Sequence, residues 1–195
     1  MKTTSMQAVR MTLTLVLLAG ALLAQVAPKP APAPWQTILQ QRLPLYGHRN
    51  WIVVADAAYP AYSQSGVETI VANQDLPSVV KYVARAIASS KHVRAAVFVD
   101  QELQFVQETD YPGVTALREA ITHTFARNSL STIPHAESIS RIDDAAKTFR
   151  VLFIKTNTTI PYTSVFMRLD CGYLTDEVDK KIKDAMAAAS KQVSK

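Results

Sequence analysis

The chain has 195 residues, one cysteine, four histidines and a formal net charge of +5, from 21 Lys and Arg residues against 16 Asp and Glu residues. A single cysteine excludes an intramolecular disulfide and a cysteine-based metal site, and the histidines lack the i, i+4 spacing of a ligand pair, so we expect no metal. The basic residues are scattered among acidic ones, which argues against nucleic-acid binding.

The N-terminal segment has the layout of an export signal. Lys2 and Arg10 precede an uncharged run rich in Leu, Val and Ala at residues 11–23, and small residues lie where a signal peptidase would cut. The run is shorter than the ~20 apolar residues that a membrane-spanning helix needs. An uncleaved membrane anchor is the alternative. We therefore expect residues 1–24 to be a signal peptide and the protein to be secreted or periplasmic.

Three further segments follow the expected signal. Residues 25–34 alternate Pro and Ala, a composition that favours an extended polyproline II spacer. Roughly 160 residues remain after it, a length typical of a single domain. We expect this α/β domain at residues 35–174. Residues 175–195 then form a charged C-terminal helix or tail, in which lysines and acidic residues are mixed as on a solvated helix face.

Apolar patterns in the expected domain predict helices and strands in alternation. Apolar or alternating runs predict strands at residues 51–55, 93–99, 150–155 and 163–168. Helical spacing of apolar residues predicts helices at residues 35–42, 76–87, 113–126 and 140–149. Asp75 is placed to cap the second of these helices. The alternation predicts a mixed, mostly parallel sheet with helices on its faces.

Polar residues that flank the strands are the first candidates for chemistry, because ligands of such sheets bind outside the carboxyl ends of the strands. His48 precedes the first strand, and imidazole is the side chain best suited to proton exchange with a hydroxyl near neutral pH. Asp56 ends that strand, where a carboxylate can orient a histidine or hold a sugar hydroxyl. A structural loop histidine and a turn-capping aspartate are the alternatives. Tyr162, taken alone, is typical of a half-buried strand aromatic.

The stretch GHRNWIVVADAAYPAYS at residues 47–63 resembles the opening of the RbsD/FucU family, which includes D-ribose pyranase and L-fucose mutarotase. Its spacing of Gly-His, apolar strand, Asp-Ala, Pro-Ala and Ser looks most like the fucose branch. Similarity continues through the helix at residues 76–87, the segment RIDDAAKTFRVLFI and Pro161-Tyr162. The resemblance implies a three-layer α/β/α fold of the RbsD type and a homo-oligomer, ring-shaped in form, with its site near subunit contacts.

The resemblance also implies an isomerase that interconverts the anomers or ring forms of a fucose- or ribose-like monosaccharide without a cofactor. A proton leaves the anomeric hydroxyl, another reaches the ring oxygen, and the ring opens and recloses, so only acid–base groups are required. His48, Asp56 and Tyr162 match the catalytic positions of the family. The expected sugar-binding residues are Asn50, Tyr59, Tyr62, Ser164 and His135. Tyr59 and Tyr62 are expected to stack on a pyranose face, and the alternative is that they only cover an edge of the core.

Several positions depart from the family pattern. Asn50 stands in place of an acid, Tyr62 in place of a histidine of fucose-type members, and Ser164 in place of an asparagine. His135 lies a few residues out of register with the sugar-contacting histidine of ribose-type members. These changes remove charge and hydrogen-bonding capacity from the expected site. The alternative function is therefore a non-catalytic monosaccharide-binding or structural relative of the same fold.

Overall fold

The computed structural model describes residues 34–125 and 130–193. The predicted signal peptide, and the predicted spacer up to residue 33, lie outside the described residues. Among the described helices, none combines the length and the apolar character that crossing a bilayer requires.

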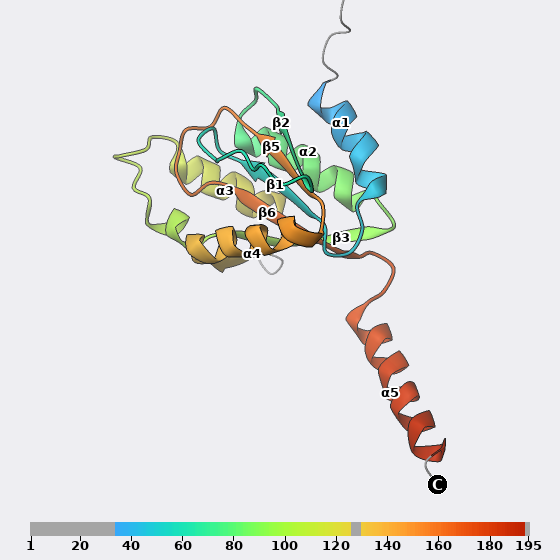
Figure 1. The fold of residues 1–195 in the computed structure, drawn as a ribbon. Coiled ribbons are helices and arrows are strands. Elements are labelled where there is room, and N and C mark those ends of the chain that lie inside the picture. Colours follow the sequence, from blue (N-terminus) through green and yellow to red (C-terminus); the bar gives the residue numbers. More distant parts are fainter. Residues whose placement is uncertain (1–33, 126–129, 194–195) are drawn as a thin grey trace, which may run out of the picture. The chain divides into compact units, whose positions relative to one another are not determined.

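The described part of the chain alternates helices and strands, as the apolar patterns predict (Figure 1). In chain order the elements are α1 (Trp35–Arg42), η1 (Leu43–Leu45), β1 (Trp51–Ala55), β2 (Val67–Val71), α2 (Leu76–Ala88), β3 (Val93–Asp100), η2 (Gln101–Phe105), α3 (Val114–Thr124), β4 (Leu130–Ile133), α4 (His135–Thr148), β5 (Val151–Lys155), β6 (Val165–Cys171) and α5 (Asp176–Val193).

The strands form one mixed sheet in the order β2-β5-β1-β6-β3-β4. Strand β5 pairs in parallel with β1 and β2, and β3 pairs in parallel with β4. Strand β6 runs antiparallel to both of its neighbours, β1 and β3. The loop 156–164 is too short for the crossover that a parallel partner requires, so β6 must reverse direction after β5. The predicted mixed, mostly parallel sheet is confirmed.

Helices cover both faces of the sheet, which gives the three-layer α/β/α fold that the resemblance implies. Residues of β1 alternate between the two cores: Ile52 and Val54 pack with α1, α2 and α3, whereas Trp51 and Val53 pack on the side of α4. All five residues of β1 are buried. The central strands therefore read as continuous apolar runs, since both of their faces are covered.

Two helix starts show how capping defines the elements. The Asp75 carboxylate accepts a hydrogen bond of 2.9 Å from the backbone N–H of Ser78, as predicted for the start of α2. Helix α4 begins at His135, earlier than the predicted residue 140. Its first backbone N–H donates to both carboxylate oxygens of Glu102, at 2.9 and 3.1 Å, so a distant acid replaces a local cap.

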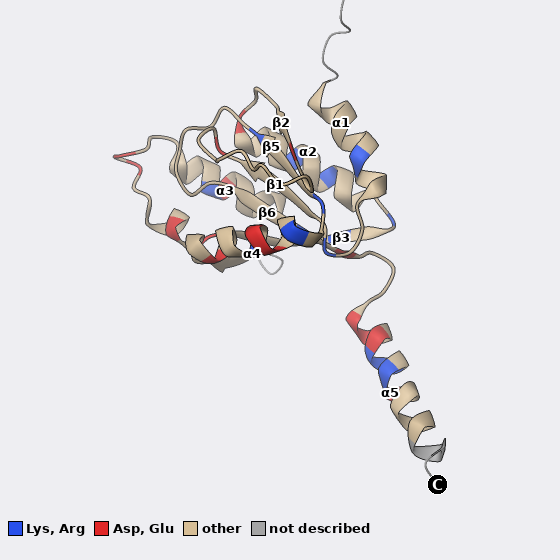
Figure 2. Ribbon diagram, in the orientation of Figure 1, with Lys and Arg blue, Asp and Glu red and all other residues tan. Residues whose placement is uncertain are grey.

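The first turns of the C-terminal helix α5 are rich in charge (Figure 2). Three acidic residues occupy its first turn, where the helix dipole favours negative charge. Lysines pair with acids one turn away, as in Lys180 with Asp184 at 2.7 Å. The segment that the sequence predicts as a charged helix or tail is thus helical over Asp176–Val193.

Candidate functional site

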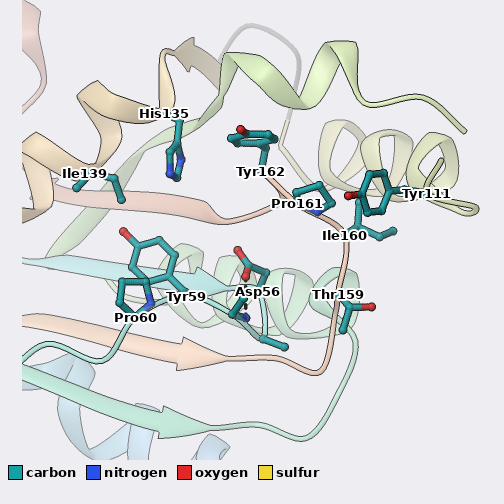
Figure 3. A pocket seen from close by; sticks show the side chains of 12 residues that line it. Asp56, Tyr59, Pro60, Tyr111, His135, Ile139, Thr159, Ile160, Pro161 and Tyr162 are labelled. Atoms are coloured by element: carbon teal, nitrogen blue, oxygen red, sulfur yellow. Dashed lines mark hydrogen bonds between the residues drawn. The ribbon is translucent and has the colours of Figure 1, made fainter.

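A cavity of about 520 Å³ opens at the carboxyl end of β1, beside the loop that leads from β5 into β6 (Figure 3). Ligands of α/β proteins are expected at the carboxyl ends of the strands. Aromatic and aliphatic side chains form most of the cavity lining, and a few polar side chains complete it. The lining includes Asp56, Tyr59, Tyr111, His135, Ile139 and Tyr162. Four of the residues predicted from the sequence therefore line one cavity.

Asp56 follows the last residue of β1 and is held by two hydrogen bonds. The Ser164 hydroxyl donates to its Oδ2 at 2.9 Å, and the backbone N–H of Ala58 donates to its Oδ1 at 2.9 Å. Ser164 is only 1% exposed, so it supports the carboxylate from the buried side. Figure 3 shows the carboxylate pointing into the cavity, toward the side on which His135 and Tyr162 lie.

His135 enters the cavity from the first turn of α4. Its Nδ1 lies 2.7 Å from Oδ2 of Asp100, the last residue of β3. Asp100 is 1% exposed, and its Oδ1 accepts a hydrogen bond of 2.7 Å from the Ser138 hydroxyl. Burial raises the pKa of the Asp100 carboxyl above its ordinary range, while the hydrogen bonds from Ser138 and His135 act in the opposite direction.

Tyr162 lies in the turn that leads into β6 and has a φ of 61°, in the left-handed region. A bulky residue in this region is a genuine backbone outlier, of the kind that gathers at functional sites. The Thr163 hydroxyl donates to the Ile160 carbonyl at 2.8 Å and closes the turn. The Tyr162 ring meets His135 edge-on, with ring centroids 5.3 Å apart.

Tyr59 and Tyr62 form an aromatic layer with Phe153 of β5. Ring centroids lie 5.0 Å apart for Tyr59 and Phe153, and 5.2 Å apart for Tyr62 and Phe153. Burial raises the pKa of Tyr59, and it raises the pKa of Tyr62 to about 12. Tyr59 is 4% exposed, and its hydroxyl forms no hydrogen bond of good geometry among the described residues, although the Tyr62 side chain lies close enough to contribute to its raised pKa. Figure 3 places that hydroxyl on the side of Ile139 and His135.

His48 and Asn50 precede β1 and so lie at the end of this strand opposite to Asp56 and the cavity. The five residues of β1 span roughly 16 Å. The His48 Nδ1 lies 3.4 Å from Oδ1 of Asp170, beside a separate cavity of about 380 Å³. The Asn50 Oδ1 accepts a hydrogen bond of 2.8 Å from the backbone N–H of Gly47 and fixes the turn. Within one chain, therefore, Asp56 does not orient His48, and His48 does not meet Tyr162.

Sequence reasoning missed Asp100 and Ser138. Asp100 ends an apolar strand just as Asp56 does, so the rule that selected Asp56 would have found it. Ser138 carries no such signal, because only the approach of α4 to β3 brings its hydroxyl to Asp100. In the part of the chain that the structure describes, no three His, Cys, Asp or Glu side chains form a group that could hold a metal ion.

Several solved structures are similar to this chain at low sequence identity. RbsD of Bacillus subtilis, solved in complex with D-ribose, is 16% identical with a TM-score of 0.50, covering 69% of this chain and 92% of its own. FucU of Bifidobacterium longum is 13% identical with a TM-score of 0.47, covering 69% and 94%. The fucose mutarotase of Streptococcus pneumoniae, in complex with L-fucose, is 16% identical with a TM-score of 0.47, covering 68% and 91%.

No match to a curated protein was found. Residues 33–173 match the model of the RbsD / FucU transport protein family, a span that takes in the whole sheet and the cavity at its edge. The chain therefore belongs to the RbsD / FucU family.

Proposed function

We propose that the protein interconverts anomeric or ring forms of a monosaccharide by cofactor-free acid–base catalysis, as a mutarotase or pyranase. The observation that carries the proposal is the convergence of a carboxylate and an imidazole, from Asp56 and His135, on one cavity with Tyr162. Exchange between ring forms needs groups that accept and donate protons near the anomeric centre, and no electron or group transfer. Membership of a family that includes a D-ribose complex supports a sugar as the ligand.

The lining of the cavity suits a sugar. Aromatic faces pack on the apolar C–H surface of a pyranose, and a few polar groups fix its hydroxyls. The Tyr59 hydroxyl is buried and forms no hydrogen bond of good geometry among the described residues, a state that ordinarily costs free energy. A sugar hydroxyl in the cavity would supply the missing hydrogen bond.

We further propose that the working form is a homo-oligomer in which His48 of one subunit completes the cavity of another. The His48 side chain is 55% exposed and lies at the end of β1 remote from Asp56. An oligomer would bring His48 of one subunit close to Asp56 and Tyr162 of another, which are distant from His48 within one chain. Light scattering tests the assembly: we expect a multimer at micromolar concentration, and a strict monomer would contradict a shared site.

A non-catalytic monosaccharide-binding protein is the second candidate. It is favoured by the separation of His48 from Asp56 and Tyr162 within one chain. The two candidates differ in one measurable property, since a binding protein would retain a sugar without changing the exchange between its anomers.

We test the proposal with the purified protein and a panel of reducing sugars that includes D-ribose and L-fucose. Saturation-transfer difference NMR reports binding, and exchange NMR reports interconversion of anomers. We expect both signals for at least one sugar. Binding without accelerated exchange would establish the second candidate, and neither signal for any sugar would overturn both.

We also propose that the protein acts after export, on the basis of the charged start and apolar run of residues 1–24. Mass spectrometry of the exported protein should find a new N-terminus near residue 25. An intact Met1 on a membrane-bound form would contradict a soluble exported protein.

A further inference from the structure

Asp100 is a buried carboxylate whose polar contacts are few. Its Oδ1 accepts the hydrogen bond from Ser138, and its Oδ2 lies 2.7 Å from the His135 Nδ1. Among the described residues, His135 is the one basic side chain that forms an ion pair with Asp100. A carboxylate that is 1% exposed is costly in free energy to keep ionised, unless hydrogen bonds and an opposite charge offset its lost hydration.

Two acids from the same stretch of chain fix His135. Glu102 holds its backbone N–H at the start of α4, and Asp100 holds its ring. The backbone and the side chain of one residue are thus fixed independently, a degree of restraint that a packing residue does not need. The Glu102 carboxylate lies at the N-terminus of α4, where the helix dipole favours negative charge.

The contact with Asp100 decides which ring nitrogen faces the cavity. A neutral imidazole carries its proton on one nitrogen, and a carboxylate partner selects the nitrogen that donates to it. Nδ1 therefore donates to Asp100, and Nε2 keeps its lone pair. The ring is 39% exposed and lines the cavity, and no described residue forms a hydrogen bond with Nε2. Figure 3 shows the ring extending from α4 into the space between Ile139 and Tyr162.

We propose that Asp100 is a positioning residue that holds His135 with Nε2 toward the sugar, and that His135 is an acid–base group of the reaction. This inference rests on the proposed function. Nε2 accepts the proton of the anomeric hydroxyl while the C1–O1 double bond forms and the C1–O5 bond breaks. The electron pair of the broken bond moves to O5, which takes a proton from the second acid–base group of the site. We propose His48 of another subunit for this group, with the Asp56 carboxylate beside it to stabilise its protonated form.

Ring closure on the other face reverses each proton transfer, so the site returns to its starting state. The developing imidazolium stays bonded to Asp100 through Nδ1–H, and the carboxylate stabilises its charge. Asp100 contacts no substrate in this scheme and acts only through His135. Ser138 keeps the second oxygen of the carboxylate in place.

Exchange NMR on His135→Gln, Asp100→Ala and the double variant tests this role. We expect His135→Gln to lower kcat by ~10²–10⁴-fold, the usual contribution of general acid–base catalysis. Asp100→Ala should lower kcat with little change in KM, and Asp100→Asn should retain part of the rate because its amide oxygen can still accept from Nδ1–H. Asp110→Ala, which removes an exposed loop carboxylate, serves as the matched control and should leave the rate unchanged.

The double variant gives the decisive comparison. If Asp100 acts only through His135, the double variant should be no slower than His135→Gln alone. A further loss that multiplies the two single effects would show an independent structural role and overturn the inference. An unchanged rate in Asp100→Ala would overturn it as well.

A readout without activity separates this inference from the proposed function. Nitrogen-15 NMR of His135 should show the proton on Nδ1 in the wild type, and a shift of the tautomer toward Nε2–H in Asp100→Ala. If the wild type does not accelerate exchange between the anomers of any sugar, the proposed function fails. The tautomer of His135 alone then decides whether Asp100 orients its ring. An Nε2–H tautomer in the wild type would overturn the inference.

Discussion

The hydroxyl of Ser164 donates a hydrogen bond of 2.9 Å to Oδ2 of Asp56, although 108 positions separate the two residues in the chain. The antiparallel pairing of β1 with β6 brings them together, because Val54 lies opposite Val165 in the sheet. The backbone N–H of Asp56 donates back to the same hydroxyl at 3.2 Å. One serine therefore fixes both the backbone and the carboxylate at the edge of the cavity.

Ser164→Ala should reduce stability because it removes a buried hydrogen bond to a carboxylate. A hydrogen bond of this kind contributes about 1–3 kcal/mol to the free energy of unfolding. Urea denaturation measures the loss, with Ser63→Ala, at an exposed position of the loop after Asp56, as the control. An equal effect of the two substitutions would show that the contact with Asp56 contributes nothing measurable.

Asp100 should make stability depend on pH in an unusual direction. Burial raises the pKa of its carboxyl above the ordinary value of 3.8, against the hydrogen bonds from Ser138 and His135 and with the nearby charge of Glu102. Between these two pKa values the folded state binds more protons than the unfolded state. The contribution of Asp100 to the free energy of unfolding therefore falls as the pH rises from about 3.8 through the folded pKa.

Asp100→Asn cannot titrate, so its stability relative to the wild type should increase across that rise in pH. Urea unfolding of both proteins from pH 3.5 upward, on the order of half-unit steps, isolates this difference from the other carboxyls. A variant that loses stability relative to the wild type as the pH rises would contradict the raised pKa.

His48→Ala and His48→Gln should abolish most of the sugar exchange and leave the fold intact, because an exposed loop side chain contributes little core packing. The expected loss is ~10²–10⁴-fold for a general acid–base group. Unchanged exchange in both variants would make His48 a structural residue and leave the second candidate function in its place.

A mixing experiment tests whether His48 acts between subunits. His48→Ala and Asp56→Asn should each be inactive alone. Oligomers formed from both variants by unfolding and refolding together would contain some sites with an intact His48 and an intact Asp56, so exchange should partly return. No recovery in oligomers shown to contain both chains would place the two residues in separate roles.

Removal of residues 176–195 should leave the fold unchanged. Val178, Ile182 and Met186 of α5 are 44%, 49% and 64% exposed, and the family match ends at residue 173. The truncation removes the ion pair of Arg94 with Asp176, and exposed pairs contribute about 0–1 kcal/mol. Thermal unfolding with a midpoint close to that of the full chain is expected, and an unfolded product would show that α5 packs on the domain.

Local patterns predicted most of the fold because the central strands and the packed helices carry strong apolar signals. Strands β2 and β4 escaped prediction since they lie at the two edges of the sheet. In β2 only Ile70 is buried, and β4 has four residues with none buried, so neither is a continuous apolar run. Edge strands pair on one side and tolerate polar residues on the other.

The site was harder to predict than the fold because its contacts join distant parts of the chain. Asp56 was selected from its position after a strand and Tyr162 from the family resemblance, and both line the cavity. Asp100 carries the same local signal as Asp56, the end of an apolar strand, but its contact with His135, 35 positions away in the chain, is visible only in the fold. The separation of His48 from Asp56 follows from the strand that the sequence predicts between them, whose five residues hold its two ends roughly 16 Å apart.

The most direct test of the account is the rate of exchange between the anomers of a sugar that binds, measured by exchange NMR at equilibrium with the wild type and with Asp56→Asn. The substitution keeps the size of the side chain and removes its charge from the cavity. We predict exchange faster than in buffer with the wild type and a loss of ~10²–10⁴-fold in the variant, at similar binding. A bound sugar whose anomers exchange no faster with the wild type than in buffer would contradict the central claim that this cavity catalyses ring opening.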